Sequence, residues 1–348
     1  MKTEIIKFLF CPRCHEALRV RNGDGESEIV TGQLECPNGH IYDIHRYVPR
    51  FIYNEQIDPR QEQTMKVFST QWEEFGQVTI DETAFSISRD WLFGRYGWNN
   101  DAGVRKYLLD KNMILDAGSA SGRYANYFAK LSGNTVFGVD IGAGVDIAQK
   151  NFGETNNVHY LQASITDLPF APNTFDFIMS DGVIHHTTNP KDTFQRLTTF
   201  LKPGGEMAIY MYHVGNPLRE MTDSYFIEAM APKTMKENME ISNVMTQLAE
   251  ELHNSGAKVT VPKRLDMLDI EPGEYTLFEL IYWKIIKLYW DPNVPFNKNW
   301  STNFGWFTPI NAYRYTGEEI IGWFEELGFE IKHTDISQRG ISIRALKL

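Results

Sequence analysis

The 348-residue chain has few cysteines, no long apolar run and no excess of positive charge. Its three cysteines all lie within the first 36 residues, and an odd, clustered set argues against a disulfide framework. No stretch approaches the apolar length of a membrane span. The start, MKTEIIKFLFCPRC, lacks the long apolar core and small-residue cleavage site of a signal peptide. We therefore expect a cytoplasmic protein without a membrane span.

The charge balance is acidic. The chain has 34 lysines and arginines against 45 aspartates and glutamates, for a net charge of −11 at pH 7. This balance disfavours a broad, sequence-independent grip on nucleic acid. The composition is otherwise that of a globular protein, with 42% apolar and 23% charged residues. The length suffices for two or three domains and at least one substantial core.

The cysteines belong to two short segments with metal-ligand spacing. Cys11 and Cys14 are separated by two residues, and Cys36 and His40 by three. Three thiolates and one imidazole make a tetrahedral set typical of structural zinc, with no open position for catalysis. Turn residues flanked by short β-prone runs lie between the two segments. We predict a zinc ribbon over residues 1–54; the alternative is three free thiols and a surface histidine.

A resemblance supports this prediction. Residues 36–51, CPNGHIYDIHRYVPRF, resemble the N-terminal zinc-binding segment of bacterial 23S rRNA guanine-N1 methyltransferases, and more loosely Trm112-type zinc modules. The resemblance covers only the first fifty or so residues. It implies a structural zinc ion and raises the question of an RNA substrate.

The rest of the chain divides into three further regions. Residues 55–105 carry helix-like segments and are predicted to form a helical extension. Strand and helix patterns alternate over 106–212 and resume over 312–348, which predicts an α/β core with a mostly parallel sheet. Two β-prone runs at the end, joined at 338–340, are predicted to place one antiparallel strand in that sheet. Residues 213–311 are predicted as an inserted, largely helical lid with an aromatic-rich helix over 274–290.

A glycine-bearing turn, LDAGSASGRY, follows the first strand of this core. Ligands of open α/β sheets lie beyond such strand ends. The spacing of Gly118 and Gly122 differs from the G-x-G-x-x-G of dinucleotide sites. Asp116, just before the turn, would repel a pyrophosphate but suits an ammonium group. S-adenosylmethionine carries an ammonium group and a sulfonium cation and has no phosphate.

The next two strand ends are consistent with a nucleoside. Asp140 can accept both ribose hydroxyls, Ile141 can pack on the adenine, and Ser164 with Ile165 can address the adenine edge. Each residue also has a structural explanation, such as a helix cap for Asp140 or tight packing for the glycines. Their occurrence at consecutive strand ends favours cofactor binding.

The segments LDAGSASGR, FGVDI, QASITDLPFAPNTFDFIMS, DGVIHHTTNP and LKPGGEMAIYMY, in this order, resemble class I S-adenosylmethionine-dependent methyltransferases, in particular UbiE-like enzymes. The resemblance spans residues 105–212 and 312–348. It implies a Rossmann-like fold with seven strands, mostly parallel, and helices on both faces. Ala120 departs from the family, which usually has a third glycine there, and Ser164 replaces a common aspartate. By this resemblance Asp116, Gly118 and Gly122 contact the methionine end, Asp140 the ribose, and Ser164 with Ile165 the adenine. Ser119 and Ile141 complete the predicted cofactor-binding set.

The segment SDGVIHHTTNP follows the fourth strand, beside the expected methyl group. Asp181 and His185 are four residues apart and would meet if this segment turned helically. A similar S-x-D-x3-H pattern occurs in phosphoethanolamine methyltransferases, where the histidine assists deprotonation. The catalytic candidates are therefore Asp181, His185 and His186; the alternative is that the histidines only pack or hydrogen-bond.

Three functions are consistent with these features. The acidic charge and the aromatic insertion favour transfer of a methyl group to a small or medium-sized metabolite, such as a natural product, a glycan or a lipid intermediate. The zinc segment favours an rRNA or tRNA base methyltransferase, although the N/D-P-P-Y tetrapeptide of enzymes that methylate exocyclic base nitrogens is absent. The third possibility is a non-catalytic S-adenosylmethionine-binding protein whose ribbon and lid bind a protein partner.

Overall fold

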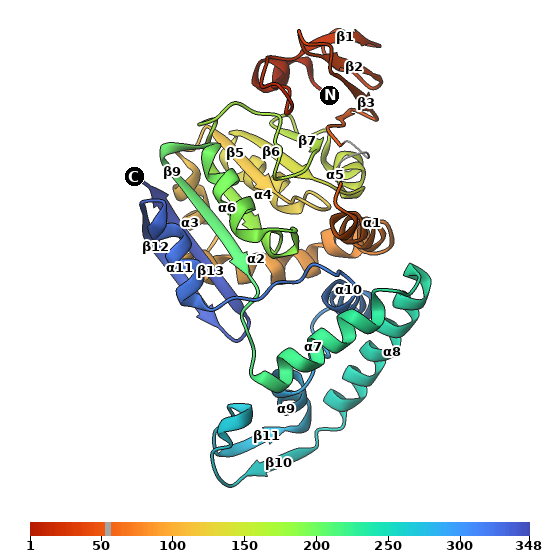
Figure 1. Ribbon diagram of the computed structural model, residues 1–348, viewed down its shortest axis with the longest axis vertical. Helices are drawn as coiled ribbons and strands as arrows, with labels where there is room; N and C mark the ends of the chain where they lie inside the picture. Colours follow the sequence, from red (N-terminus) through yellow and green to blue (C-terminus); the bar gives the residue numbers. More distant parts are fainter. Residues whose placement is uncertain (53–56) are drawn as a thin grey trace.

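A computed structural model describes residues 1–52 and 57–348 (Figure 1). Within these residues the strands form an N-terminal sheet of four strands, a central sheet of seven and a small sheet of two. The predicted junction between residues 54 and 55 lies outside the described residues. None of the described helices is both long and apolar enough to cross a membrane.

The N-terminal unit is an antiparallel meander that packs at one end of the central sheet (Figure 1). A backbone hydrogen bond of 2.7 Å from the Phe51 amide to the Gln162 carbonyl joins it to the core. The guanidinium of Arg50 adds an ion pair with Asp146 at 2.6 Å. The unit contains η1 (Thr3–Phe8), β1 (Arg19–Gly23), β2 (Gly32–Glu35), β3 (Ile41–His45) and β4 (Val48–Pro49).

Three helices follow: α1 (Pro59–Ile80), α2 (Glu82–Tyr96) and α3 (Asp101–Leu108). The side chain of Asp58 accepts hydrogen bonds from the first amides of α1, and that of Asp81 does the same for α2. Such caps satisfy amides that have no partner within the helix, so they fix where each helix begins.

The central sheet confirms the predicted fold. Its strand order is β12-β13-β9-β8-β5-β6-β7, and β13 alone runs antiparallel to its neighbours, β9 and β12. The C-terminal hairpin thus places one antiparallel strand in the sheet. The strands are β5 (Met113–Ala117), β6 (Thr135–Asp140), β7 (Val158–Gln162), β8 (Phe175–Asp181), β9 (Leu201–Met211), β12 (Phe329–Ser337) and β13 (Gly340–Lys347).

Helices cover both faces of this sheet. Alternation along the strands points Leu115 and Phe137 into one buried cluster, with side chains of α6 and α11, and points Ile114 and Val136 into another, with α2 to α4. Because successive strand residues face opposite sides, each strand supplies two cores. The covering helices of the core are α4 (Arg123–Ser132), α5 (Gly144–Phe152), α6 (Pro190–Thr199) and α11 (Gly317–Glu326).

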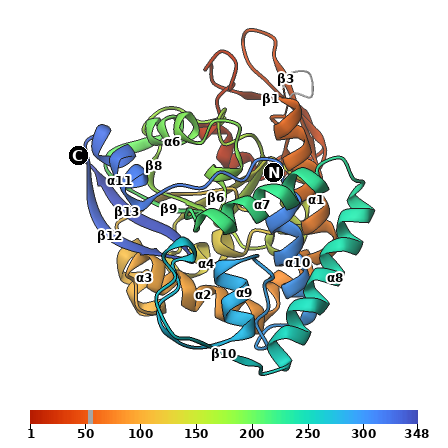
Figure 2. The ribbon, with the colours of Figure 1, turned by 60° about the horizontal axis from the view of Figure 1, so that its bottom comes forward.

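The inserted lid has its own apolar cluster, which includes Met230, Met245, Leu288, Trp306 and Phe307. Figure 2 shows its helix α10 beside α1, and side chains of α1 bond to it: the Gln71 amide donates to the Ser301 carbonyl at 2.8 Å. The lid therefore contacts the core through α1. It contains α7 (Pro217–Met230), α8 (Met235–Asn254), β10 (Lys258–Val261), η4 (Asp266–Leu268), β11 (Gly273–Thr276), α9 (Leu277–Lys284) and α10 (Phe296–Phe307).

The prediction of one aromatic-rich helix over residues 274–290 is wrong in its extent. Residues Gly273–Thr276 form strand β11, and helix α9 ends at Lys284. Beyond it, the Asn303 amide bonds both backbone groups of Tyr289, and the Asn216 amide bonds the Lys284 carbonyl. Side chains distant in sequence thus satisfy backbone groups that a longer helix would have used.

Candidate cofactor and acceptor site

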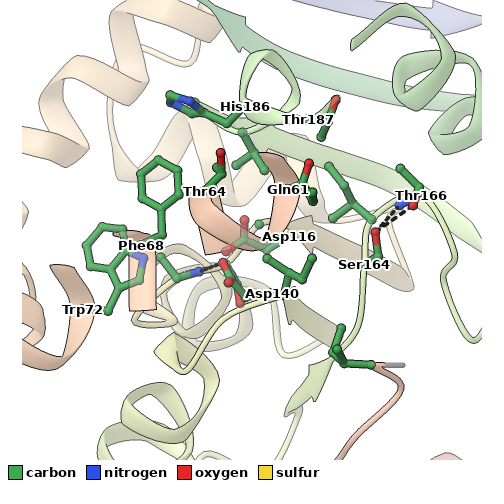
Figure 3. A pocket seen from close by; sticks show the side chains of 18 of the residues that line it. Gln61, Thr64, Phe68, Trp72, Asp116, Asp140, Ser164, Thr166, His186 and Thr187 are labelled. Carbon is green, nitrogen blue, oxygen red and sulfur yellow. Dashed lines mark hydrogen bonds between the residues drawn. The ribbon is translucent and has the colours of Figure 1, made fainter. Parts of the chain in front are cut away.

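A cavity of about 330 Å³ opens where β5, β6 and β8 end, beneath helix α1 (Figure 3). Of the aspartates that line it, three lie at or near the ends of different strands: Asp116, Asp140 and Asp181. Their clustering follows from parallel pairing, because the carboxyl ends of the strands meet at one edge. The predicted residues that line the cavity are Asp116, Gly118, Ser119, Asp140, Ile141, Ser164 and Ile165 from the cofactor set, and Asp181 and His186 from the catalytic set.

The turn after β5 is shaped by left-handed backbone. Gly118 has φ +93°, and a Cβ atom there would come within 2.2 Å of Val183. Ala120, where the family usually has glycine, also adopts a left-handed φ of +50°. That conformation costs a non-glycine residue about 1 kcal/mol. Gly122 does not line the cavity. Its carbonyl accepts a hydrogen bond from the Tyr160 hydroxyl at 3.1 Å, so it packs the start of helix α4 against β7.

Asp140 ties two loops together. Its carboxylate accepts hydrogen bonds from the Ala120 amide at 2.9 Å and from the Gly142 amide at 2.8 Å. Burial raises the pKa of Asp140, and the two amides oppose that effect. The carboxylate is therefore fixed in orientation before any ligand arrives, which lowers the entropic cost of binding one.

Asp116 lies close to other negatively charged carboxylates. It is 2% exposed and accepts a single backbone bond, from Ala125 at 3.1 Å. Burial, then the charge of Asp181, raises its pKa to about 7. A cation bound between these carboxylates would reverse the charge repulsion. The cavity is thus suited to a positively charged ligand.

Asp181 is held from outside the cavity. The Arg95 guanidinium donates to its two oxygens at 3.0 and 3.1 Å, and the Tyr96 hydroxyl donates at 3.0 Å. The predicted contact between Asp181 and His185 is wrong: no hydrogen bond joins them in the described structure. The cause is the loop, in which Gly182 at φ +79° leads into a short 3-10 turn, Ile184–His186, instead of an α-helical one.

The two adjacent histidines differ in their surroundings. His185 is fully buried, its ring lies on that of Tyr212 with centroids 3.7 Å apart, and it does not line the cavity. Neither of its ring nitrogens finds a hydrogen-bond partner among the residues described. Burial places the pKa of His185 well below its usual value. These features are those of a packing residue.

His186 does line the cavity. Its Nδ1 lies 2.5 Å from the carbonyl oxygen of Asn311. A carbonyl only accepts, so Nδ1 carries the proton and Nε2 keeps a lone pair. Burial lowers the pKa of His186 to about 4, so the ring is neutral at physiological pH. Of the two histidines, only His186 combines access to the cavity with a free lone pair.

One wall of the cavity comes from α1 and was not predicted as part of the site. Thr64, Phe68 and Trp72, spaced four apart, line it, as does Gln61 (Figure 3). The ring of Phe68 lies 4.8 Å from that of His186, centroid to centroid. Helical spacing of these residues predicts the helix itself. It carries no information on which surface that face covers, so the sequence alone gave no signal for this wall.

The cavity also holds unsatisfied polar groups. The buried hydroxyls of Thr64 and Ser119 line it and have no hydrogen-bond partner in the part of the chain that the structure describes. Buried hydroxyls in native proteins are almost always paired, so these are available to a polar ligand. The Ser164 hydroxyl, in contrast, forms a hydrogen bond of 2.7 Å with the Thr166 hydroxyl. Three carboxylates, an aromatic wall and two free hydroxyls fit a cationic nucleoside such as S-adenosylmethionine.

The four predicted metal ligands come together in the N-terminal unit. The ligand atoms of Cys11, Cys14, Cys36 and His40 all lie within 4.8 Å of one another. The Nδ1 atom of His40 is 3.3 Å from the Sγ atoms of both Cys11 and Cys36, and the Sγ atoms of Cys14 and Cys36 are 3.6 Å apart. A tetrahedral zinc site with bonds of about 2.3 Å to sulfur and 2.0 Å to nitrogen has edges of roughly 3.5–3.8 Å. The donor set and its spacing fit zinc.

Comparison with known proteins identifies one family within the chain. Residues 115–209 match the family described as methyltransferase domain. This region of the chain is a methyltransferase domain, and the predicted resemblance to S-adenosylmethionine-dependent methyltransferases is confirmed.

The similar proteins include two C-methyltransferases. The ubiquinone/menaquinone biosynthesis C-methyltransferase UbiE of Haemophilus ducreyi is 26% identical over 42% of this chain and 56% of its own length. The Klebsiella pneumoniae protein of the same name is 30% identical over 42% of this chain and 59% of its own length. The match thus spans a little over half of these relatives. Magnesium protoporphyrin IX methyltransferase from Synechocystis is a structural neighbour, with 13% identity, a TM-score of 0.44, and coverage of 82% of this chain and 98% of its own.

Proposed function

We propose that the chain transfers a methyl group from S-adenosylmethionine to a small or medium-sized metabolite. The observation that carries this proposal is the cavity at the strand ends, in which Asp116, Asp140 and Asp181 are gathered within the methyltransferase domain. A phosphate-bearing nucleotide would meet three carboxylates there. A sulfonium nucleoside would instead be attracted to them.

The roles of the residues follow from their places. The oriented carboxylate of Asp140 would accept the ribose hydroxyls, and Asp116 would pair with the ammonium group above the turn at Gly118. Ile141, Ser164 and Ile165 would surround the adenine. When bound, the cofactor supplies an electrophilic methyl group, and the chain holds the acceptor in line with it; such positioning provides much of the acceleration in group transfer.

A proton acceptor is also present. In this proposal the Nε2 atom of His186 takes a proton from an acceptor that must lose one. Asp181 is already paired with Arg95 and Tyr96. It is therefore assigned to shaping the charge of the cavity. His185 is assigned to packing.

The preference for a metabolite rests on charge and on the roof over the site. The chain carries a net charge of −11, and the cavity walls are acidic. A polyanionic RNA would be repelled by both. Helix α1 lines the cavity and is held by the lid helix α10, so the acceptor must fit beneath α1.

We also propose a structural zinc ion in the N-terminal unit. Cys11, Cys14, Cys36 and His40 would fill all four positions of a tetrahedral ion, which leaves none for substrate. The ion would hold together a unit that has little core of its own.

Calorimetry and mass spectrometry test the proposal. The metal-loaded full chain should bind S-adenosylmethionine and S-adenosylhomocysteine, and a screen of metabolite extracts should yield a product heavier by one methyl group. Absence of binding to both nucleosides would refute the proposal. Methylation of total RNA, with no methylated small molecule, would move the assignment to RNA.

A further inference from the structure

A second cavity, of about 360 Å³, lies in the lid between α7, η4, α9 and α10. Among the described residues it shares no lining side chain with the cofactor cavity. Charged side chains line it in unusual number. They are Arg219, Glu220, Asp223, Asp266, Asp269, Lys284, Lys287 and Arg314, with His213 at the edge.

The acids on the α7 side are already paired. The Arg219 guanidinium donates to both oxygens of Asp223, at 3.2 and 3.1 Å, and to the carbonyl of Tyr282 at 2.7 Å. Arg314 lies 3.2 Å from Asp223 and 3.7 Å from Glu220. Two acids therefore face two arginines.

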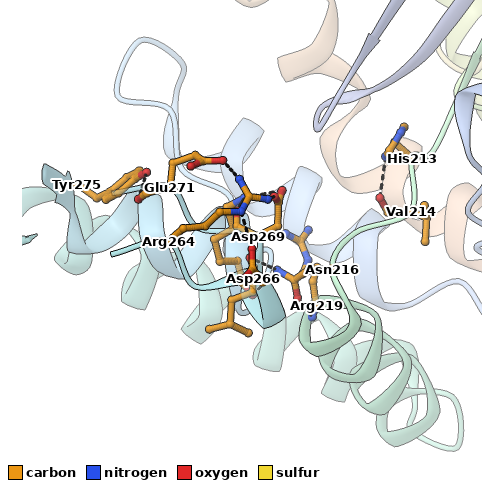
Figure 4. A network of polar contacts seen from close by, with 11 residues as sticks. His213, Val214, Asn216, Arg219, Arg264, Asp266, Asp269, Glu271 and Tyr275 are labelled. Atoms are coloured by element: carbon orange, nitrogen blue, oxygen red, sulfur yellow. Dashed lines mark hydrogen bonds and ion pairs between the residues drawn. The ribbon is translucent and has the colours of Figure 1, made fainter. Parts of the chain in front are cut away.

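The acids on the η4 side are paired as well (Figure 4). Arg264 bonds Asp266 at 2.6 Å and contacts Asp269 at 3.3 Å, and it also forms an ion pair with Glu271. The Lys284 ammonium lies 3.3 Å from Asp269. His213 points away and bonds the Val214 carbonyl. Each of these acids therefore has a cationic partner.

Lys287 has no acid. Its Nζ atom lies 3.3 Å from the centroid of the Trp306 ring and 5.8 Å from that of Tyr212. Burial and the nearby Arg219 lower the pKa of Lys287 well below its usual value, and a bound anion would oppose that shift. Within residues 1–52 and 57–348 it makes no hydrogen bond or ion pair. Arg314 beside it is also incompletely used: its side chain is 8% exposed, and its Nε atom lacks a hydrogen-bond partner among the same residues. The lining charges thus balance, four cations against four acids, but Lys287 and the Nε atom of Arg314 are left without an acidic or accepting partner.

We propose that the lid cavity is a binding site for an oxyanion, a carboxylate or phosphate group, held by Lys287 and Arg314 over the face of Trp306. An ammonium and a guanidinium are the donors that proteins use for such groups, and charge-assisted hydrogen bonds to an anion would satisfy the atoms now without partners. The guanidinium of Arg219, which is paired with Asp223, lies 5.9 Å from the centroid of the same ring.

The site is connected to the cofactor cavity by a row of rings. The Phe68 ring contacts His186, which contacts His185; His185 lies on Tyr212, and Tyr212 lies 4.2 Å from Trp306. Two alternative ligands share this chemistry. One is an anionic group carried by the methyl acceptor, an assignment that rests on the proposed function. The other is a separate small anion.

The test uses inorganic phosphate and acetate as probes with the full chain, at constant ionic strength set by chloride. At least one probe should raise the melting temperature in a saturable way, since a ligand that binds only the folded state stabilises it. Lys287→Met should weaken that binding at least tenfold. Lys298→Met is the matched control, because Lys298 is a lysine of the same lid, in α10, that lines neither cavity, and burial lowers its pKa to about 7.

Saturable binding that is retained in Lys298→Met and lost in Lys287→Met supports the proposal. Equal effects in all three proteins, or no saturable effect of either probe, overturns it. If Lys287→Met does not fold, Arg314→Gln replaces it with the same expectation. Competition between the probe and the methyl acceptor identifies the acceptor as the source, and binding without competition identifies a separate anion. S-adenosylmethionine binding by the same proteins reports on the proposed function independently.

Discussion

The Nδ1 atom of His186 and the carbonyl oxygen of Asn311 are 2.5 Å apart, and this hydrogen bond determines which ring nitrogen can act on a substrate. His186 lies in the loop after β8, and Asn311 lies in the segment that returns from the lid to the core. The bond therefore couples the position of the lid to the tautomer of the imidazole. A lid out of place would free Nδ1 and remove the constraint on Nε2.

The first prediction compares the two histidines. His186→Phe should lower kcat by about 10²–10⁴-fold for an acceptor that must lose a proton, because it removes the Nε2 lone pair. His185→Phe should lose less than tenfold, because His185 only packs on Tyr212. Steady-state kinetics would measure both, and cofactor binding should be unchanged. A larger loss in the His185 variant would contradict the assignment.

The second prediction concerns the ribose. Asp140→Ala should weaken S-adenosylmethionine binding about 100-fold or more, since it removes the oriented acceptor of two hydrogen bonds to a charged group. Asp167→Ala is the matched control, because Asp167 also lines the cavity but is mostly exposed. Calorimetry gives both affinities, and circular dichroism checks folding. Tight binding by a folded Asp140 variant would show that the ribose lies elsewhere.

The third prediction is a pH dependence set by Asp116, whose pKa is raised to about 7. A cationic ligand favours the ionised carboxylate, so the dissociation constant for S-adenosylmethionine should rise about tenfold as the pH falls from 8 to 6. Asp116→Asn should bind weakly at both pH values and flatten the profile. A wild-type profile without slope would exclude Asp116 as the partner of the cation.

The same residue affects stability in the opposite direction. The folded pKa of Asp116 lies above the usual value of 3.8, so its contribution to the free energy of unfolding is present below that value and is lost as the pH rises through about 7. The cofactor-free protein should therefore lose stability over this range. Asp116→Asn should lose less, as thermal melts at each pH would show.

The fourth prediction concerns the metal. The chain should contain one zinc ion, and removing it with a chelator should also weaken cofactor binding, because Phe51, at the end of the N-terminal unit, lines the cofactor cavity. Elemental analysis and calorimetry measure the two quantities. His40→Ala should reproduce the loss, and His45→Ala, at an exposed histidine outside the cluster, should not. A full complement of zinc in His40→Ala would refute the ligand set.

The sequence predicts the parts of the molecule that depend on local pattern. The strands of the sheet follow from their apolar runs, and the cavity floor follows from Asp116 and Asp140, because parallel strands bring their ends together. The metal cluster follows from spacing alone.

The parts that failed depend on contacts distant in sequence. The ion pair of Asp181 with Arg95 joins residues 86 positions apart, so local spacing suggested His185 instead. The length of helix α9 was overestimated because Asn216 and Asn303 take up backbone groups that the helical pattern assigns to the helix.

Helix α1 contacts both the cofactor cavity and the lid. Its residues Thr64, Phe68 and Trp72 line the nucleoside cavity, and its residues Gln63 and Gln71 bond to the lid at Thr308 and Ser301. The lid cannot swing aside without pulling on this helix. Any movement of the lid would therefore also shift one wall of the cavity.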